Sequence, residues 1–263
     1  MKFSRRMLFA AAAIAMMASA APAMADIRFG VAAEPYPPFT SKDASGKWVG
    51  WEVDLMDAVC AQLKEKCSIV EVAWDGIIPA LTSKQFDLIW SSISITAERK
   101  QTIDFTSMYY NTPTVIIGAK TGDKDITPAH LAGKIIGVQV ATVHANYVNK
   151  YFGPTSTVKT YNTQDEANQD LAAGRLDYIQ ADGSALDAFL ATDAGKACCE
   201  LKGQVPDDKE ILGEGVGGGL RKEDTALKDK INGAIAALAK DGTFDKITAK
   251  YPPLVGKMIV PKP

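Results

Sequence analysis

Several residue patterns that mark common functional classes are missing from this chain of 263 residues. It has two histidines and four cysteines, with neither a Cys-x-x-Cys motif nor clustered histidines, so we expect no metal site and no cofactor. Acidic and basic residues nearly balance, at 31 against 29, and the sequence has no basic patch, which argues against nucleic acid as a partner. No apolar run is long enough to span a membrane.

What is present begins with an export signal. Three basic residues precede an apolar run at residues 7–15, and Ala23-Met24-Ala25 fits the small-x-small pattern of a signal-peptide cleavage site. We therefore expect residues 1–25 to be a signal peptide that is removed after Ala25. Its removal takes away three basic residues and no acidic ones, which leaves a net charge of about −5.

The four cysteines form two close pairs. Cys60 and Cys67 lie seven residues apart, and export makes a disulfide between them feasible. In one continuous helix these residues would lie about 10 Å apart along the axis, which is too far to bridge. The bridge therefore requires the helix to end near Lys66. The adjacent Cys198 and Cys199 leave two alternatives, a strained vicinal disulfide or free thiols.

Strand and helix signals alternate along the chain, which predicts an α/β fold with mostly parallel sheets. The first half predicts strands at 27–32, 68–74 and 87–90, with a helix at 54–64. The second half repeats the pattern, with strands at 134–139 and 158–161 and a helix at 163–173.

Two segments take similar places in the two halves. Residues 86–92 and 176–182 each follow a helix and a tight turn, carry an aspartate, and bring a polar residue to the end of a strand. Because ligands of open α/β sheets bind at that end, we expect Ser92 and Asp182 to hold equivalent positions on opposite walls of one cleft. The chain has two candidate crossings between lobes, at residues 110–113 and 213–219.

Residues 87–99 carry the clearest functional signal. A short apolar strand opens into three serines and a threonine, then into a helix that begins after Thr96 and contains Arg99. Hydroxyls, backbone N–H groups at a helix start and an arginine are thereby gathered at the end of one strand. This combination is typical of a carboxylate receptor, because the guanidinium group can bind both carboxylate oxygens.

A series of short motifs in a fixed order resembles the periplasmic amino-acid-binding proteins of ABC uptake systems, known as solute-binding protein family 3. This family includes lysine/arginine/ornithine-, histidine- and opine-binding proteins. The resemblance covers essentially all of residues 26–251. It is carried by the segments 36–39, 50–55, 74–81, 91–99, 137–139, 174–177 and 241–246.

The resemblance implies the two-lobed fold of type II periplasmic-binding proteins, with the ligand in the cleft between the lobes and a hinge of two crossings. Residues 26–110 would form the first part of lobe 1, residues 114–212 would form lobe 2, and residues 216–263 would return to lobe 1. The hinges would lie near 111–113 and 213–215.

The resemblance also assigns roles to site residues. Arg99 and Ser94 would bind the ligand α-carboxylate, Asp182 the α-ammonium, and Tyr36 and Trp74 would flank the ligand side chain. Elementary electrostatics agrees, because a zwitterion is best held by a fixed cation and a fixed anion in a site drier than water. Flat aromatic rings accept an aliphatic stem and, by cation–π attraction, a cationic head group.

Further candidates surround this core. Ser91 and Ser92 offer hydrogen bonds from the serine-rich segment. The family usually has a Gly-Thr-Thr-like turn where this chain has residues 140–143. The backbone N–H groups of Thr142 and Val143 could still bind carboxylate there, but a side-chain hydroxyl at position 143 is missing. Glu34 lies near the position where members that bind cations carry an acid, so it either selects the ligand side chain or is a solvated loop carboxylate.

The function that follows is the capture of an amino acid in the periplasm for delivery to a membrane ABC permease, by a monomer with no catalytic residues. The ligand would be cationic, such as arginine, lysine, ornithine or histidine, or an opine-type conjugate. A neutral polar amino acid such as glutamine is the alternative ligand. A dehydratase-like enzyme or a sensor on the same fold are the alternative functions.

Overall fold

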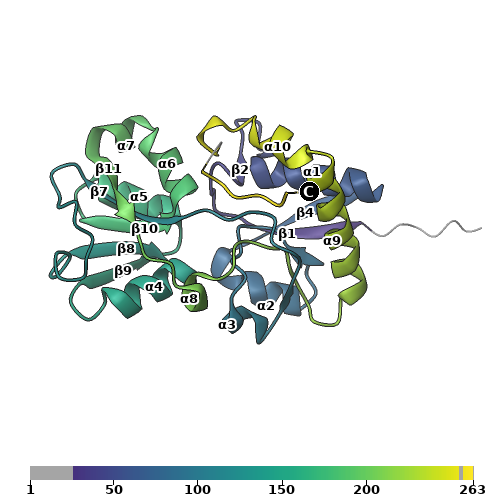
Figure 1. Ribbon diagram of the computed structural model, residues 1–263, viewed down its shortest axis with the longest axis horizontal. Helices are drawn as coiled ribbons and strands as arrows, with labels where there is room; N and C mark the ends of the chain where they lie inside the picture. Colours follow the sequence, from purple (N-terminus) through teal and green to yellow (C-terminus); the bar gives the residue numbers. More distant parts are fainter. Residues whose placement is uncertain (1–25, 255–256, 263) are drawn as a thin grey trace, which may run out of the picture.

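The computed structural model describes residues 26–254 and 257–262, so the predicted signal peptide and its cleavage site lie outside the described residues. The chain forms two α/β lobes that lie side by side and are joined by extended segments (Figure 1). Among the described residues, no helix is both long and apolar enough to cross a membrane. The predicted two-lobed α/β architecture is confirmed.

The first lobe is built on a sheet of order β4-β1-β5-β12-β6. Its strands are β1 (Ile27–Ala32), β4 (Cys67–Val72), β5 (Leu88–Ile89), β6 (Asp104–Phe105) and β12 (Gly219–Leu220), and a small hairpin adds β2 (Ser41–Lys42) and β3 (Trp48–Val49). Its helices are α1 (Trp51–Leu63), α2 (Ile77–Thr82), α3 (Ala97–Lys100), α9 (Thr225–Lys240) and α10 (Thr243–Thr248), with short 3-10 turns η1 (Trp74–Gly76) and η2 (Pro252–Leu254).

The second lobe is built on a sheet of order β11-β7-β10-β8-β9. Its strands are β7 (Thr114–Ala119), β8 (Ile135–Gln139), β9 (Thr157–Tyr161), β10 (Tyr178–Asp182) and β11 (Cys199–Gln204). Its helices are α4 (Val143–Tyr151), α5 (Gln164–Ala172), α6 (Gly183–Leu190), α7 (Asp193–Cys198) and α8 (Lys209–Leu212).

The two sheets share one pairing pattern. In the first lobe, β1 lies between two parallel neighbours, β4 and β5. In the second lobe, β8 lies in the same way between β9 and β10. Two further strands complete each sheet, and each of them pairs antiparallel with its neighbour, so that only β12 and β7 run opposite to the other strands. Gly30 of β1 pairs with Ile89, and the corresponding Gly137 of β8 pairs with Ile179. Ser92 lies three residues after Ile89, and Asp182 lies three residues after Ile179. This confirms their predicted equivalence.

The disulfide between Cys60 and Cys67 forms because helix α1 ends early. The helix stops at Leu63, and Lys64 takes a left-handed conformation with φ of 57° that turns the chain back. The two Cα atoms then lie 6.2 Å apart, which is within the range that a disulfide spans. Cys198 and Cys199 form a vicinal disulfide where α7 meets β11, so the first of the two alternatives is the one found.

The chain passes from the first sheet to the second between β6 and β7, and returns between β11 and β12. A third segment lies beside the first crossing, because Ile259 and Asn111 exchange backbone hydrogen bonds of 2.8 Å each. Lys257 also forms an ion pair of 2.6 Å with Asp187 of α6. The C-terminal segment therefore contacts both lobes, which the sequence did not indicate.

Candidate functional site

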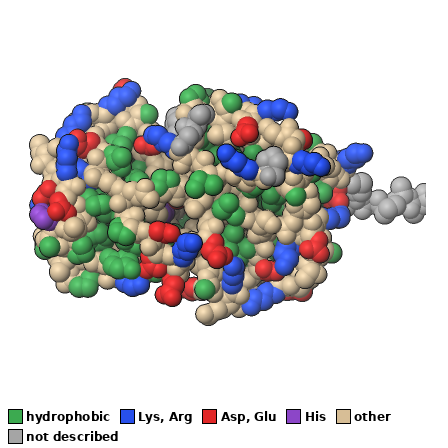
Figure 2. All heavy atoms as spheres, viewed as in Figure 1, with side chains coloured by type: hydrophobic (Ala, Val, Ile, Leu, Met, Phe, Trp, Pro, Cys, Tyr) green, Lys and Arg blue, Asp and Glu red, His purple; other side chains and the backbone are tan. Residues whose placement is uncertain are grey.

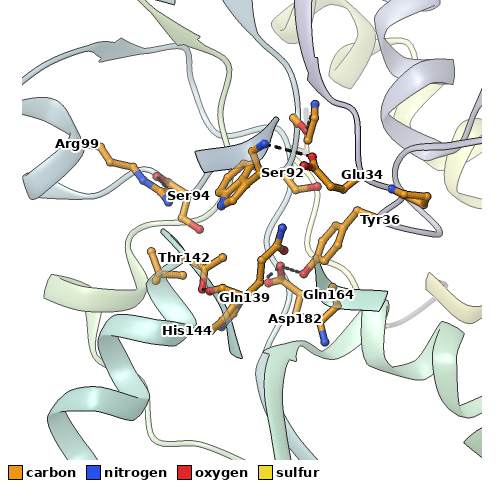
Figure 3. A pocket seen from close by; sticks show the side chains of 15 residues that line it. Glu34, Tyr36, Ser92, Ser94, Arg99, Gln139, Thr142, His144, Gln164 and Asp182 are labelled. Atoms are coloured by element: carbon orange, nitrogen blue, oxygen red, sulfur yellow. Dashed lines mark hydrogen bonds and ion pairs between the residues drawn. The ribbon is translucent and has the colours of Figure 1, made fainter. Parts of the chain in front are cut away.

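A cavity lies between the lobes and is lined by all ten residues that the sequence nominated as ligand contacts. Figure 3 shows residues of the first lobe, among them Arg99, Ser94 and Tyr36, facing residues of the second lobe such as Asp182. The cavity encloses about 530 Å³ of empty space, some of it open to solvent. Its complete lining is Ala32, Glu34, Pro35, Tyr36, Trp74, Ser91, Ser92, Ser94, Arg99, Gln139, Thr142, Val143, His144, Gln164 and Asp182.

Arg99 supplies the positive charge on the wall of the first lobe. Its guanidinium donates to the backbone oxygen of Ser94 at 3.0 Å and, across the cleft, to that of Ala141 at 3.2 Å. The same group lies over the ring of Trp74, with 5.6 Å between Cζ and the ring centroid. Burial lowers the pKa of Arg99 to about 10, against the opposing charges of Glu98 and Asp182, so it remains a cation at neutral pH.

Asp182 supplies the negative charge on the opposite wall. It stands at the start of α6, but its carboxylate does not cap that helix. Instead it accepts hydrogen bonds from the Tyr36 hydroxyl at 2.7 Å and the Thr112 hydroxyl at 3.2 Å, and His144 Nε2 lies 3.5 Å away. Burial alone would raise the pKa of Asp182, but the contacts with His144, Tyr36 and Thr112 outweigh it and lower the pKa. The group is therefore an anion at neutral pH.

The two aromatic residues come from loops of the first lobe. Burial, followed by the charge of Asp182, raises the pKa of Tyr36 well above its usual value, so the hydroxyl acts as a donor. Trp74 begins η1, and its indole N–H donates across the cleft to the backbone oxygen of Val140 at 3.1 Å. Glu34 accepts a hydrogen bond of 3.1 Å from the backbone N–H of Trp74, so one of its oxygens holds the aromatic wall in place.

The serines differ in what their hydroxyls do. Ser91 accepts a hydrogen bond of 3.0 Å from the backbone N–H of Ala32 and thereby ties the segment to β1. Ser92 has a left-handed backbone with φ of 53°, and both its backbone N–H and its hydroxyl donate at 2.8 Å to the carboxylate of Glu52. Ser94 presents its backbone oxygen to Arg99. Of the three, only the Ser94 side chain has no partner among the hydrogen bonds of the described residues.

The start of helix α4 forms the floor on the second lobe. Thr142 caps the helix, because its hydroxyl accepts from the backbone N–H of Ala145 at 3.0 Å and donates to the backbone oxygen of Gln139 at 2.7 Å. Ala141 precedes it in a left-handed conformation, which turns the chain from β8 into the helix. The first N–H groups of a helix have no partner within it, so those near Val143 are suited to bind an anion.

Five lining residues were not nominated from the sequence: Ala32, Pro35, Gln139, His144 and Gln164. A signal existed for two of them. Gln139 ends β8, and Gln164 is the first residue of α5, directly after its N-cap Thr163, so both lie at the strand-end edge where ligands bind. His144 becomes a site residue only through Asp182, which lies 38 positions further along the chain, and that proximity has no local signal.

On the face shown in Figure 2, basic and acidic side chains are intermixed. Within the part of the chain that the structure describes, no group of three or more His, Cys, Asp or Glu side chains is placed to hold a metal ion.

Comparisons with known proteins agree with this geometry. The L-arginine-binding protein of Pseudomonas aeruginosa is 42% identical over 227 residues, which cover 86% of this chain and 87% of that protein. The histidine-binding periplasmic protein of Salmonella typhimurium is 38% identical over 218 residues, covering 82% of this chain and 84% of that protein. An ancestral arginine-binding protein solved with bound arginine superposes with a TM-score of 0.78 at 33% identity, covering 86% of this chain and 97% of that one.

Residues 27–253 match the family described as bacterial extracellular solute-binding proteins, family 3. The match covers both lobes and both crossings, and it agrees with the two-lobed architecture of the structure. The chain belongs to family 3 of the bacterial extracellular solute-binding proteins.

Proposed function

We propose that this protein captures a cationic amino acid, with arginine as the first candidate, in the cleft between its lobes and delivers it to a membrane ABC permease. The observation that carries the proposal is the pair of opposite charges on facing walls, Arg99 from the first lobe and Asp182 from the second. An α-amino acid carries the complementary pair on one carbon atom. Relatives that bind arginine and histidine support a cationic side chain.

Each end of the ligand has suitable partners. The α-carboxylate binds the remaining N–H groups of Arg99, with the Ser94 hydroxyl and the amides at Thr142 and Val143 nearby. The α-ammonium binds Asp182. These interactions are charge-assisted and lie between partly buried side chains, which strengthens them relative to the same contacts at the surface.

The ligand side chain lies between Tyr36 and Trp74, whose rings accept an aliphatic stem. Glu34 and the amide oxygens of Gln139 and Gln164 then accept hydrogen bonds from a cationic head group. Because one Glu34 oxygen already accepts from Trp74, a cation there would contact the other oxygen and the edge of the aromatic wall. This arrangement supports Glu34 as a residue that selects the side chain.

Binding changes the balance between open and closed forms. The ligand contacts Arg99 and Asp182 together only when the lobes are closed, so it binds the closed form better and shifts the population toward it. The crossings near residues 111–113 and 213–215 act as the hinge. The closed form presents a joint surface of both lobes to the permease.

This role also accounts for the oligomeric state, the location and the type of activity that we propose. A monomer is sufficient, because one chain supplies both walls of the site. Export through the N-terminal signal places the protein in the periplasm, where its periplasmic relatives act. We infer binding rather than catalysis, because Arg99 and Asp182 on facing walls form the charge pair complementary to a zwitterion.

A thermal-shift screen of ligand-free residues 26–263 tests the proposal against all amino acids, ornithine, citrulline and several opines. A ligand at a hundredfold excess over its Kd should stabilise the fold by about 2.7 kcal/mol, a shift of a few degrees. We expect responses to arginine, lysine, ornithine or histidine. A response to glutamine alone would retain capture and remove Glu34 as the selecting residue, whereas silence across the panel would contradict capture and favour the enzyme or sensor alternatives.

A further inference from the structure

One buried acid directly beneath the cavity has no role in the proposed binding scheme. Glu52 lies in the first turn of α1 and is completely buried. Its carboxylate accepts three hydrogen bonds from two residues. Oε1 accepts from the Ser92 backbone N–H at 2.8 Å and from the Tyr109 hydroxyl at 2.5 Å, and Oε2 accepts from the Ser92 hydroxyl at 2.8 Å.

We propose that Glu52 is a positioning residue whose ionised form turns the Ser92 hydroxyl so that its lone pairs face the ligand ammonium, and that ligand binding therefore drives a proton off Glu52. The proposal deepens the proposed function, because it adds a second acid to the ammonium end of the same site. It stands on the geometry of three groups: a buried carboxylate, a hydroxyl that it controls, and a cavity that this hydroxyl lines.

The hydrogen bonds fix the direction of the Ser92 hydroxyl. When Glu52 is ionised it can only accept, so the Ser92 O–H points at Oε2 and its lone pairs remain for the cavity. When Glu52 is protonated on Oε2, that oxygen becomes a donor, and the Ser92 hydroxyl must accept from it and turn its own proton away. The two forms of Glu52 thus present opposite ends of one hydroxyl dipole to a ligand.

The ligand ammonium is the group whose binding depends on the orientation of the Ser92 hydroxyl. Ser92 stands at the strand position equivalent to that of Asp182, and the charge of Asp182 acts on Glu52. A ligand ammonium beside Asp182 therefore meets two acids, one directly and one through a hydroxyl. A positive charge at this distance favours the ionised form of Glu52, and the displaced proton goes to the solvent.

Glu52 is poised to make this exchange near neutral pH. Burial raises its pKa to about 7, against the lowering effect of the bonds from Tyr109 and Ser92. The other titratable groups that interact with Glu52 are Asp182 and the hydroxyls of Tyr36, Tyr109 and Tyr110. The pKa of Asp182 is lowered and those of all three tyrosines are raised well above the usual value. Among these groups, Glu52 is the one that titrates between pH 5.5 and 8.

Calorimetric titration of the mature protein with L-arginine tests the inference directly on the unaltered chain. Titrations at pH 7 in buffers of different ionisation enthalpy report the number of protons exchanged, and we expect release of up to about half a proton. We also expect the affinity to fall about tenfold between pH 8 and pH 5.5, since one pKa unit of coupling corresponds to a factor of ten.

A single substitution separates Glu52 from its neighbours. Glu52→Gln keeps the Oε1 acceptor for Ser92 and Tyr109 and replaces Oε2 by an NH₂ donor, so it mimics the protonated form with the same shape. We expect Glu52→Gln to abolish the pH dependence and to bind about tenfold more weakly than the unaltered protein at pH 8. Asp57→Asn, on the exposed side of the same helix, is the matched control and should keep the original pH profile.

The outcomes distinguish this inference from the function on which it depends. Tight binding with no proton exchange and a flat pH profile in the unaltered protein would overturn the role of Glu52 and leave amino-acid capture intact. A pH profile that persists in Glu52→Gln and disappears in His144→Gln would assign the exchange to the histidine beside Asp182 and also overturn it. Failure of every ligand in the screen to bind at either pH would overturn the proposed function and this inference together.

Discussion

The third strand of each sheet, β5 in the first lobe and β10 in the second, is preceded by the same local arrangement. Asp87 accepts a hydrogen bond of 2.9 Å from the backbone N–H of Arg28, and Asp177 accepts one of 2.8 Å from that of Ile135. In both cases the aspartate fixes the beginning of the neighbouring strand, β1 or β8. The two segments then deliver their last polar residue to the same edge of their sheets.

The difference begins at the last residue. Ser92 has a left-handed backbone and leads into an irregular loop that ends in α3 and Arg99, whereas Asp182 leads directly into α6. One lobe therefore presents a cation from a short helix that follows a loop, and the other presents an anion from a strand end. Two copies of one scaffold thus form an asymmetric site because the chain differs in a few residues after equivalent strands.

Among the variants that test this asymmetry, Arg99→Ala has the largest expected effect. It removes the cation of the first lobe and leaves the ligand carboxylate without its main counter-charge, so we expect arginine binding to weaken about 1,000-fold, or about 4 kcal/mol. Calorimetry measures the effect. Lys100→Ala, which removes the adjacent exposed cation, is the control and should bind normally. Unchanged affinity in Arg99→Ala would remove this residue from the site.

Asp182→Asn tests the opposite wall with little change in shape. The neutral amide leaves the ligand ammonium unpaired, and we expect binding to weaken by about 2–3 kcal/mol. Because the pKa of Asp182 is lowered in the fold, its charge stabilises the protein above its ordinary pKa and is lost only as the pH falls through the lowered value. Asp193→Asn, at an exposed position of α7 in the same lobe, is the control. Equal affinity in the two variants would show that the second lobe supplies no anion to the ligand.

Gly30 in the first lobe and Gly137 in the second test how similarly the two sheets are packed. A Cβ added at Gly30 would lie 2.4 Å from the ring of the buried Phe86, and one at Gly137 would lie 2.4 Å from Cδ1 of Leu176. A buried ring cannot move aside as easily as the end of a leucine. We therefore expect Gly30→Ala to destabilise by about 2 kcal/mol and Gly137→Ala by about 1 kcal/mol or less, measured by chemical denaturation. A larger loss of stability in Gly137→Ala than in Gly30→Ala would show that the packing around the two strands differs more than their pairing does.

A comparably small effect is expected of Tyr36→Phe. This variant removes the hydrogen bond from the Tyr36 hydroxyl to Asp182 across the cleft, which we expect to reduce the stability of the closed form by about 1 kcal/mol. Small-angle X-ray scattering should then show a larger average radius without ligand. Tyr161→Phe removes a similar bond to Asp170 within the second lobe and should leave the radius unchanged. A radius that changes equally in both variants would contradict a role for Tyr36 in closure.

Much of this arrangement could be predicted from the sequence, because its signals are local. Residues 86–92 and 176–182 share an aspartate, an apolar strand and a terminal polar residue, and that similarity placed Ser92 opposite Asp182 correctly. The predicted end of the helix before Cys67 followed from the reach of a disulfide alone. All ten nominated site residues line one cavity, although their contacts with a ligand remain a prediction.

The role of Glu52 could not be found in this way. The apolar stripe at residues 54–64 indicated a helix from Asp54, whereas α1 begins at Trp51 and turns Glu52 inward. An acid in the first turn of a helix is usually solvated, and its partner Ser92 lies 40 residues away. Long-range pairing of buried polar groups leaves no periodic pattern, so only the folded structure reveals it.

The hydrogen bonds that join the lobes have a consequence for the rate of uptake. Tyr36 with Asp182, Trp74 with Val140 and Arg99 with Ala141 join protein atoms directly, so they favour closure whether or not the cleft is occupied. A ligand can enter only after these bonds break together. The rate of association should therefore rise with ligand concentration and then level off at the opening rate of the lobes, and stopped-flow tryptophan fluorescence would measure that limit.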